Sequence, residues 1–209
     1  MFFLQGHRLK FFKNSRRGKI LRAMTLHDVM FWSSDAFVTV IFALYVVQFI
    51  EGGNATHVGL SYFVYSLVRG LLSIPVGQFF DKHRGRIDEV WGLALASFGG
   101  GIVYILLSQA HEPWHLYVAM FAMGFFSLLD VMSWRVLFYT SLDKTEYAET
   151  VGIYETITMV TVSFAVALGG IAGDRFGFDM VVLFGGIMMF VGGFVPLMVR
   201  RFFDIKDAS

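Results

Sequence analysis

The stretch FDMVVLFGGIMMFVGGFVPLMV, residues 178–199, decides the fold class of this protein. It contains no charged residue after Asp179. A helix needs about 20 apolar residues to cross the hydrocarbon core of a bilayer, and this run is long enough to do so. The stretch therefore predicts a transmembrane helix, with lipid as its solvent.

Five further apolar runs of similar length precede it. The chain is 56% hydrophobic and 16% charged, with a mean hydropathy of +0.62, whereas an ordinary soluble domain has about 25% charged residues. The short connections leave no room for a second domain. The six expected spans are Thr25–Ile50, His57–Phe80, Val90–Gln109, His115–Ser141, Thr150–Gly173 and Phe178–Val199.

These spans predict an all-α membrane domain over residues 25–200. Residues 1–24 form a basic cytoplasmic segment, either an interfacial helix on the inner leaflet or a tail that only sets topology. Residues 201–209 form a short cytoplasmic tail.

The distribution of positive charge predicts the orientation. Of the 17 Lys and Arg residues, only Arg69, Arg135 and Arg175 lie outside the N-terminal segment, the loops after the second and fourth spans, and the C-terminal tail. Positively charged loops remain in the cytoplasm. We therefore expect a multi-pass protein of the plasma membrane, such as a bacterial inner membrane, with both termini in the cytoplasm.

The chain also repeats itself weakly between its two halves. The beginning of the second span, Val58-Gly59-Leu60, matches that of the fifth, Val151-Gly152-Ile153. At the same offset, Gly77 falls on Gly170 and the pair Asp81-Lys82 falls on Asp174-Arg175. The second and fifth spans cross the membrane in opposite directions. The repeat thus predicts two triplets of helices with inverted topology, a known construction of secondary transporters.

Residues 77–86, GQFFDKHRGR, resemble the signature loop of the major facilitator superfamily between its second and third helices. That signature reads Gly, three residues, Asp, a base, one residue, Gly and Arg, and one extra residue stands here between Lys82 and Gly85. Residues 170–177, GIAGDRFG, resemble the pattern with its usual spacing but without the terminal Arg. The resemblance implies a six-helix half of such a transporter, most like its C-terminal half.

The resemblance also implies a cytoplasmic gate, where Asp81, Lys82 and Arg86 form a charge network that holds helices together. The alternative is that these bases only set topology. The gate motif comprises Gly77, Asp81, Lys82, Gly85 and Arg86, and the repeat motif comprises Gly170, Asp174, Arg175 and Gly177.

Three charged residues fall near one plane in the middle of the bilayer. At about 1.5 Å per residue, Asp35 lies about 15 Å from the inner side, and Arg69 and Asp130 lie about 16 Å from it. A charge at this depth is costly and usually faces the bundle interior. We expect Asp35, Arg69 and Asp130 to line a substrate or proton pathway. The alternative is a static salt bridge between Arg69 and one of the two acids.

Two other charges, Arg135 and Glu155, lie about 9 Å deep on the fourth and fifth spans and are expected to form a structural or gating pair. His27 and His57 lie at helix ends, where we expect them to be solvated. The third and sixth spans carry no internal charge. This pattern matches the division in the superfamily, whose third and sixth helices stand outside the cavity.

These features favour a secondary active transporter of a small solute that works by alternating access, with a proton as the candidate coupling ion. Full members of the superfamily have twelve helices, so the resemblance implies a second six-helix half, from a homodimer or a separate chain. The alternative is a non-transporting six-helix protein that assembles with or regulates a transporter half.

The expected partners are therefore the lipid bilayer, a small-molecule substrate and that second half. The chain has no Cys, no phosphate loop, no nucleophile elbow and no His-Glu-x-x-His motif. We accordingly expect no enzyme activity, no metal, no cofactor and no nucleic-acid partner.

Overall fold

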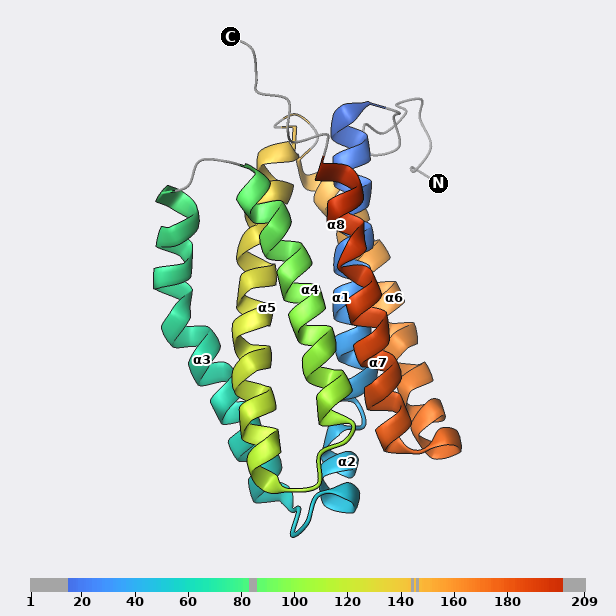
Figure 1. Cartoon of the computed structure of the whole chain (residues 1–209). Helices are drawn as coiled ribbons and strands as arrows, with labels where there is room; N and C mark the ends of the chain where they lie inside the picture. The colour runs from blue at the N-terminus through green and yellow to red at the C-terminus, as the bar shows by residue number, and fades with distance from the viewer. Residues whose placement is uncertain (1–14, 83–85, 144, 146, 201–209) are drawn as a thin grey trace.

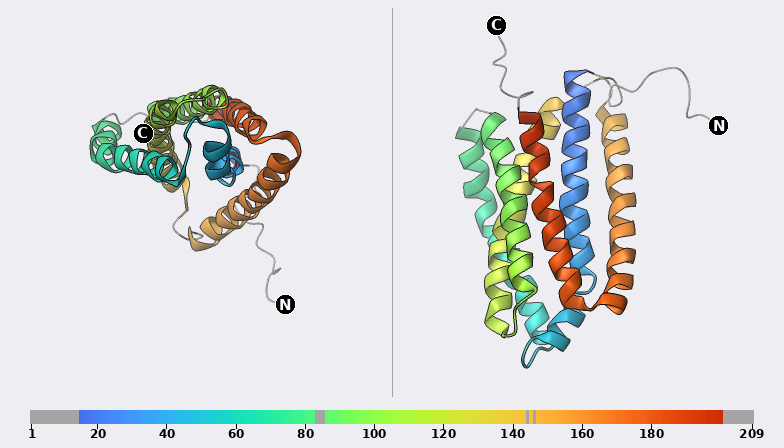
Figure 2. Two further views of the ribbon diagram at one scale, coloured as in Figure 1. Left: turned by 90° about the horizontal axis from the view of Figure 1, so that it is seen from below. Right: turned by 45° about the vertical axis from the view of Figure 1, so that its right-hand side comes forward.

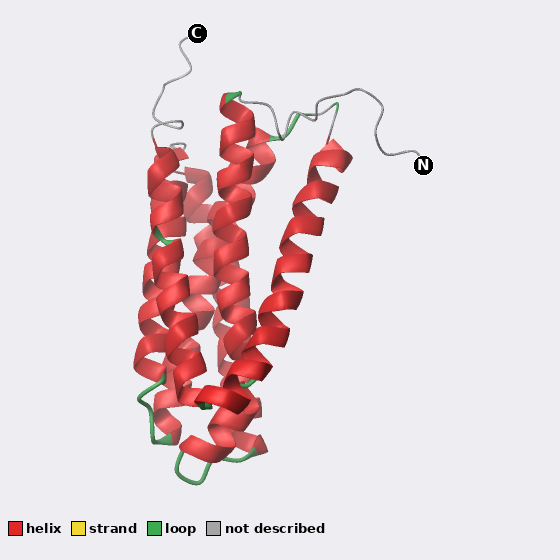
Figure 3. Ribbon diagram, turned by 90° about the vertical axis from the view of Figure 1, so that its right-hand side faces the viewer, coloured by secondary structure: helices red, strands yellow, loops and turns green. Residues whose placement is uncertain are grey.

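A computed structural model of the chain describes residues 15–82, 86–143, 145 and 147–200. Within these ranges every regular element is a helix and no strand occurs (Figure 3). Residues 1–14 of the expected basic segment, and the expected tail 201–209, lie outside the described residues. The helices are α1 (Arg16–Thr39), α2 (Phe42–Phe49), α3 (Ala55–Lys82), α4 (Arg86–Leu107), α5 (Pro113–Ser141), α6 (Tyr147–Phe176), α7 (Phe178–Gly192) and α8 (Phe194–Val199).

These helices form six rods that run side by side (Figure 1). Helices α1 and α2 together make the first span, bent by 45° at their junction, and α7 with α8 makes the sixth, Phe178–Met198. Pro196 lies within α8, where its missing N–H removes one helical hydrogen bond next to the break at Gly193. The start of α1 and the end of α8 lie at the same end of the bundle, so the prediction of six crossings is confirmed (Figure 1).

The first span begins earlier than the sequence predicts. Helix α1 starts at Arg16, where the Ser15 side chain caps it by accepting a hydrogen bond from Gly18 N at 3.1 Å. Ile20, Leu21 and Met24 are buried against α4 and α5. Residues 16–24 are therefore continuous with the rest of α1, and the interfacial location of this segment stays a prediction. The apolar side of this segment packs against protein rather than lipid.

The packing of the helices follows the two inverted triplets. Helix α3 packs on α5 as α6 packs on α1, and α4 packs on α5 as α7 packs on α1. The first triplet of spans comprises α1–α4 and the second comprises α5–α8. If the two triplets are exchanged, the α3–α5 contact becomes the α6–α1 contact, and the α4–α5 contact becomes the α7–α1 contact. Helices α4 and α7, one from each triplet, pack against each other. The predicted half-fold of two inverted three-helix repeats is thereby confirmed.

Glycine makes the close contact between α4 and α7 possible. A Cβ atom added to Gly101 would lie 2.7 Å from the Gly186 carbonyl oxygen, and one added to Gly186 would lie 2.8 Å from the Gly101 carbonyl oxygen. Small residues let membrane helices approach to backbone contact in this way. The glycine-rich third and sixth spans thus hold the two triplets together.

Helices α3 and α6 lie at the two flanks of the bundle (Figure 2). Most of their side chains are exposed, including Leu71 and Ile74 on α3 and Phe164 and Leu168 on α6. Helices α4 and α7 pack side by side along one side of the bundle, between the two flanks (Figure 2).

Candidate functional site

The first part of the candidate site is a small cavity beside Asp35 on α1. The Tyr104 hydroxyl of α4 donates a hydrogen bond to Asp35 Oδ1 at 2.5 Å. The cavity has a volume of about 100 Å³, and Tyr62 and Tyr65 of α3 also line it. A carboxylate surrounded by tyrosine hydroxyls inside a membrane bundle can hold a cation or a proton.

Arg69 lies next to this cavity, one helical turn after Tyr65 on α3. Its Nη1 donates to the Tyr65 hydroxyl at 3.0 Å, and its Cζ lies 5.8 Å from the centre of the Trp32 ring of α1. The charges of Arg69 and Asp35 interact across this region, although the two side chains form no ion pair in the described part of the chain. The structure thus brings Asp35 and Arg69 together through Tyr65.

A wider groove opens on the other side of Tyr65, between α3 and α5. Its volume is about 400 Å³. The polar side chains that line it are Tyr65, Ser66, Arg69, Ser73 and Arg135. Tyr65 borders both spaces and thus lies between the small cavity and this groove.

Asp130 does not join Asp35 and Arg69. It lies on the buried face of α5, and its Oδ1 is 2.7 Å from His27 Nε2 of α1. Both side chains have an exposed fraction of 0%, so the expectation of a solvated His27 is wrong. The three charges expected to meet near the midplane are therefore separated in the structure. Asp130 pairs with His27, whereas Arg69 lies near Asp35.

A third acid, Asp28, lies beside this pair and was not anticipated from the sequence. The Tyr154 hydroxyl of α6 donates to Asp28 Oδ2 at 2.6 Å, and the charges of Asp28 and Asp130 interact. The adjacent His27-Asp28 within an apolar helix was the sequence signal for this cluster.

His57 differs from expectation as well, because its Nδ1 lies 2.5 Å from the Tyr117 hydroxyl.

Arg135 and Glu155 do not form the expected pair. Arg135 lines the groove between α3 and α5, whereas Glu155 is exposed on α6, which packs on α1 and α7. No ion pair joins the two described side chains. The packing of α5 and α6 against different helices explains the separation.

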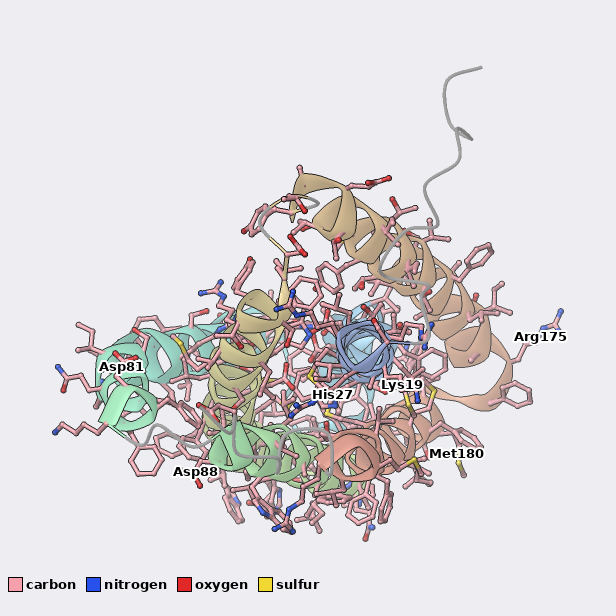
Figure 4. All side chains as sticks on the ribbon, turned by 90° about the horizontal axis from the view of Figure 1, so that it is seen from above. Lys19, His27, Asp81, Asp88, Arg175 and Met180 are labelled. Carbon is pink, nitrogen blue, oxygen red and sulfur yellow. The ribbon has the colours of Figure 1, made fainter. Side chains whose placement is uncertain are left out.

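The two loop motifs lie at opposite ends of the bundle, as inverted repeats require. Seen from above, Asp81 and Arg175 also lie at opposite edges, far from the central His27 (Figure 4). Asp81, Lys82, Asp174 and Arg175 form no ion pair with any described residue. A charge network at the gate therefore stays a prediction. Gly85 lies outside the described residues, as does the side chain of Arg86.

The glycines of the motifs occupy equivalent positions. A Cβ atom added to Gly77 or to Gly170 would have no atom within 4 Å. Gly177 adopts a φ of 92° where α6 turns into α7, a conformation that glycine adopts readily and other residues rarely. The repeat motif is thus needed for the turn at this end of the bundle.

Replacing Tyr104 with phenylalanine tests the support of Asp35. The change removes the hydrogen bond from Tyr104 to the Asp35 carboxylate, which is expected to lower the free energy of unfolding by about 1–3 kcal/mol. Unfolding in mixed micelles measures the loss. Tyr147→Phe serves as the matched control, since Tyr147 is exposed; equal effects of the two changes would contradict the prediction.

Comparison with known proteins gives one match. A family model described as Major Facilitator Superfamily matches residues 29–208. No curated protein and no solved structure matches the chain significantly. The matched range covers all six spans apart from the first turns of α1.

Proposed function

The chain belongs to the major facilitator superfamily, and from this premise we propose that it is a secondary active transporter of a small solute that works by alternating access. Membership makes it a multi-pass membrane protein of a transporter family. The proposal of solute transport by alternating access is supported by the polar side chains of Asp35, Arg69 and Tyr65, which lie close together inside the bundle. Charges at membrane depth mark substrate and ion pathways.

We further propose that this transport is coupled to protons. Asp35, which accepts a hydrogen bond from Tyr104, contacts the substrate or the proton, and Arg69 lies next to its cavity, bonded to Tyr65. Asp130 pairs with His27 away from the space that Asp35 and Arg69 border, and it is not part of the proposed pathway. The protein lies in the plasma membrane with both termini in the cytoplasm, as the positive charges favour.

Transport requires a second six-helix half in this proposal, supplied by another copy of the chain. The exposed flanks of α3 and α6 support this arrangement. Gly77 on α3, and Gly152 and Gly170 on α6, have no atom within 4 Å of an added Cβ, and small residues on a helix surface permit close helix packing. The mass of the purified protein in detergent, corrected for the micelle, is expected to be twice the 23.6 kDa of one chain. A mass of one chain would contradict the homodimer and leave a separately encoded half as the partner.

Asp35→Asn tests the proposed transport. The protein is placed in liposomes that contain a pH-sensitive dye, and solutes from a panel are added outside while proton movement is recorded. We expect Asp35→Asn to lower the solute-dependent proton flux at least tenfold, a change of about 1.4 kcal/mol, because the amide cannot bind and release a proton.

Asp143→Asn is the control, since Asp143 pairs with Arg17 at the end of the bundle. A wild-type protein that forms dimers but moves no proton with any solute would favour the alternative, a non-transporting assembly partner. An Asp35→Asn protein with undiminished flux would exclude Asp35 from the pathway.

A further inference from the structure

We propose that the groove between α3 and α5 is an oxyanion site, so that the substrate of the proposed transporter carries a carboxylate or phosphate group. This inference rests on the proposed function and names its substrate class. It stands on Arg69 and Arg135, which project into one groove from two packed helices.

The charges of the groove are unbalanced. Both arginines line it, and no acidic side chain does so in the described part of the chain. One carboxylate that interacts with Arg69, that of Asp35, lies in the adjoining cavity beyond Tyr65. One carboxylate facing two guanidinium groups leaves an excess positive charge, which an anionic ligand can neutralise.

The hydrogen-bonding capacity of the two arginines is also largely unused. A guanidinium group has five N–H donors. Arg69 uses one of them on the Tyr65 hydroxyl, and Arg135 donates to no described residue. Guanidinium groups bind carboxylates and phosphates through two parallel hydrogen bonds. Two such groups at membrane depth are costly unless water or an anion meets them.

Gly70 keeps the groove open beside Arg69. It lines the groove, and a Cβ atom added there would have no atom within 4 Å. A leucine at this position can therefore extend into the empty space without displacing protein atoms. This offers a way of blocking the site that leaves both arginines in place.

The experiment measures thermal stabilisation of the full chain in nanodiscs of phosphatidylcholine at constant ionic strength. Inorganic phosphate and succinate are the anionic probes, and succinamide is the neutral probe of matched shape. We expect both anions to raise the Tm in a saturable manner and succinamide to have no effect. Equal stabilisation by succinamide, or none by either anion, would overturn the proposal.

Variants connect the binding to the groove. Arg135→Gln and Gly70→Leu are each expected to raise the apparent Kd for succinate at least tenfold, with a smaller rise for Arg135→Lys. The controls are Arg17→Gln, which removes one charge outside the groove, and Gly59→Leu, which adds the same side chain at another open position of α3. Binding that survives Arg135→Gln and Gly70→Leu would place the anion elsewhere.

A lipid headgroup presents the same phosphate chemistry, so a second arm adds phosphatidylglycerol to the nanodiscs. One outcome would overturn the substrate class and assign the groove to lipid. In that outcome phosphatidylglycerol raises the Tm, Arg135→Gln abolishes this increase, and the soluble anions have no effect. Proton flux driven only by neutral or cationic solutes would support the proposed transport function and contradict the anionic substrate class. Anion binding without any proton flux would support the anion site and contradict proton-coupled transport.

Discussion

Replacement of His27 by alanine is expected to lower the free energy of unfolding by about 3 kcal/mol, the upper part of the usual cost of leaving a buried polar group without its hydrogen-bond partner. His27 Nε2 lies 2.7 Å from Asp130 Oδ1, and neither side chain is exposed. Asp130 Oδ2 has no hydrogen-bond partner within the described structure. Without His27 the buried carboxyl group of Asp130 therefore loses the hydrogen bond that its Oδ1 makes in the folded protein. Unfolding in mixed micelles of increasing denaturing detergent measures the loss.

His111→Ala is the matched control, because His111 is exposed in the loop before α5. We expect its effect to stay within about 0.5 kcal/mol. A second comparison separates the unpaired polar group from lost packing: the double variant His27→Leu/Asp130→Leu removes both partners and is expected to regain most of the loss. If His27→Ala were as mild as His111→Ala, the buried contact between His27 and Asp130 would not contribute to the stability of the folded protein.

The sequence predicts the number and direction of the spans because lipid imposes strict conditions on them. A segment in the bilayer must satisfy its own backbone hydrogen bonds, so length and apolarity alone identify a membrane helix. The inverted triplets could also be predicted, since Gly77-to-Lys82 and Gly170-to-Arg175 end spans of opposite direction. Both features depend on position along the chain rather than on contacts between helices.

The composition of the site was harder to predict, because depth in the membrane says nothing about the face of a helix. Asp130 shares the depth of Asp35 and Arg69, yet it points toward α1 and pairs with His27. Arg135, five residues later, is rotated by roughly 140° on the same helix and lines the groove with Arg69. The rotation of α5 about its axis is fixed by packing, through buried residues such as Met123 and Leu137.

The start of the first span shows a second limit of sequence patterns. Arg16, Arg17, Lys19 and Arg22 reduce the hydropathy of this segment and suggest a surface location. In the folded chain, the apolar residues between them meet Trp134 and Phe138 of α5 and other side chains, which form a buried cluster. Hydropathy measures the preference for lipid and cannot detect a partner that is itself protein.

Gly101→Ala is expected to lower the free energy of unfolding by about 3 kcal/mol, although alanine is the better helix former. A Cβ at this position would lie 2.6 Å from Phe190 N and 2.7 Å from the Gly186 carbonyl oxygen of α7. Both atoms belong to backbone, so they cannot move aside as the end of a side chain could. The helices must separate instead, and overpacking of this kind typically costs about 1–3 kcal/mol and occasionally more.

Gly59→Ala gives the matched comparison, with an expected effect of the opposite sign. An added Cβ at Gly59 has no atom within 4 Å, so the change retains the gain in helix propensity, up to about 1 kcal/mol. The same unfolding measurement in mixed micelles serves both variants. Because one methyl group is added to a helical glycine in each case, the difference isolates the contact between α4 and α7. Equal stabilities of the two variants would mean that the triplets do not meet at backbone distance, and the arrangement of the half-fold would have to be revised.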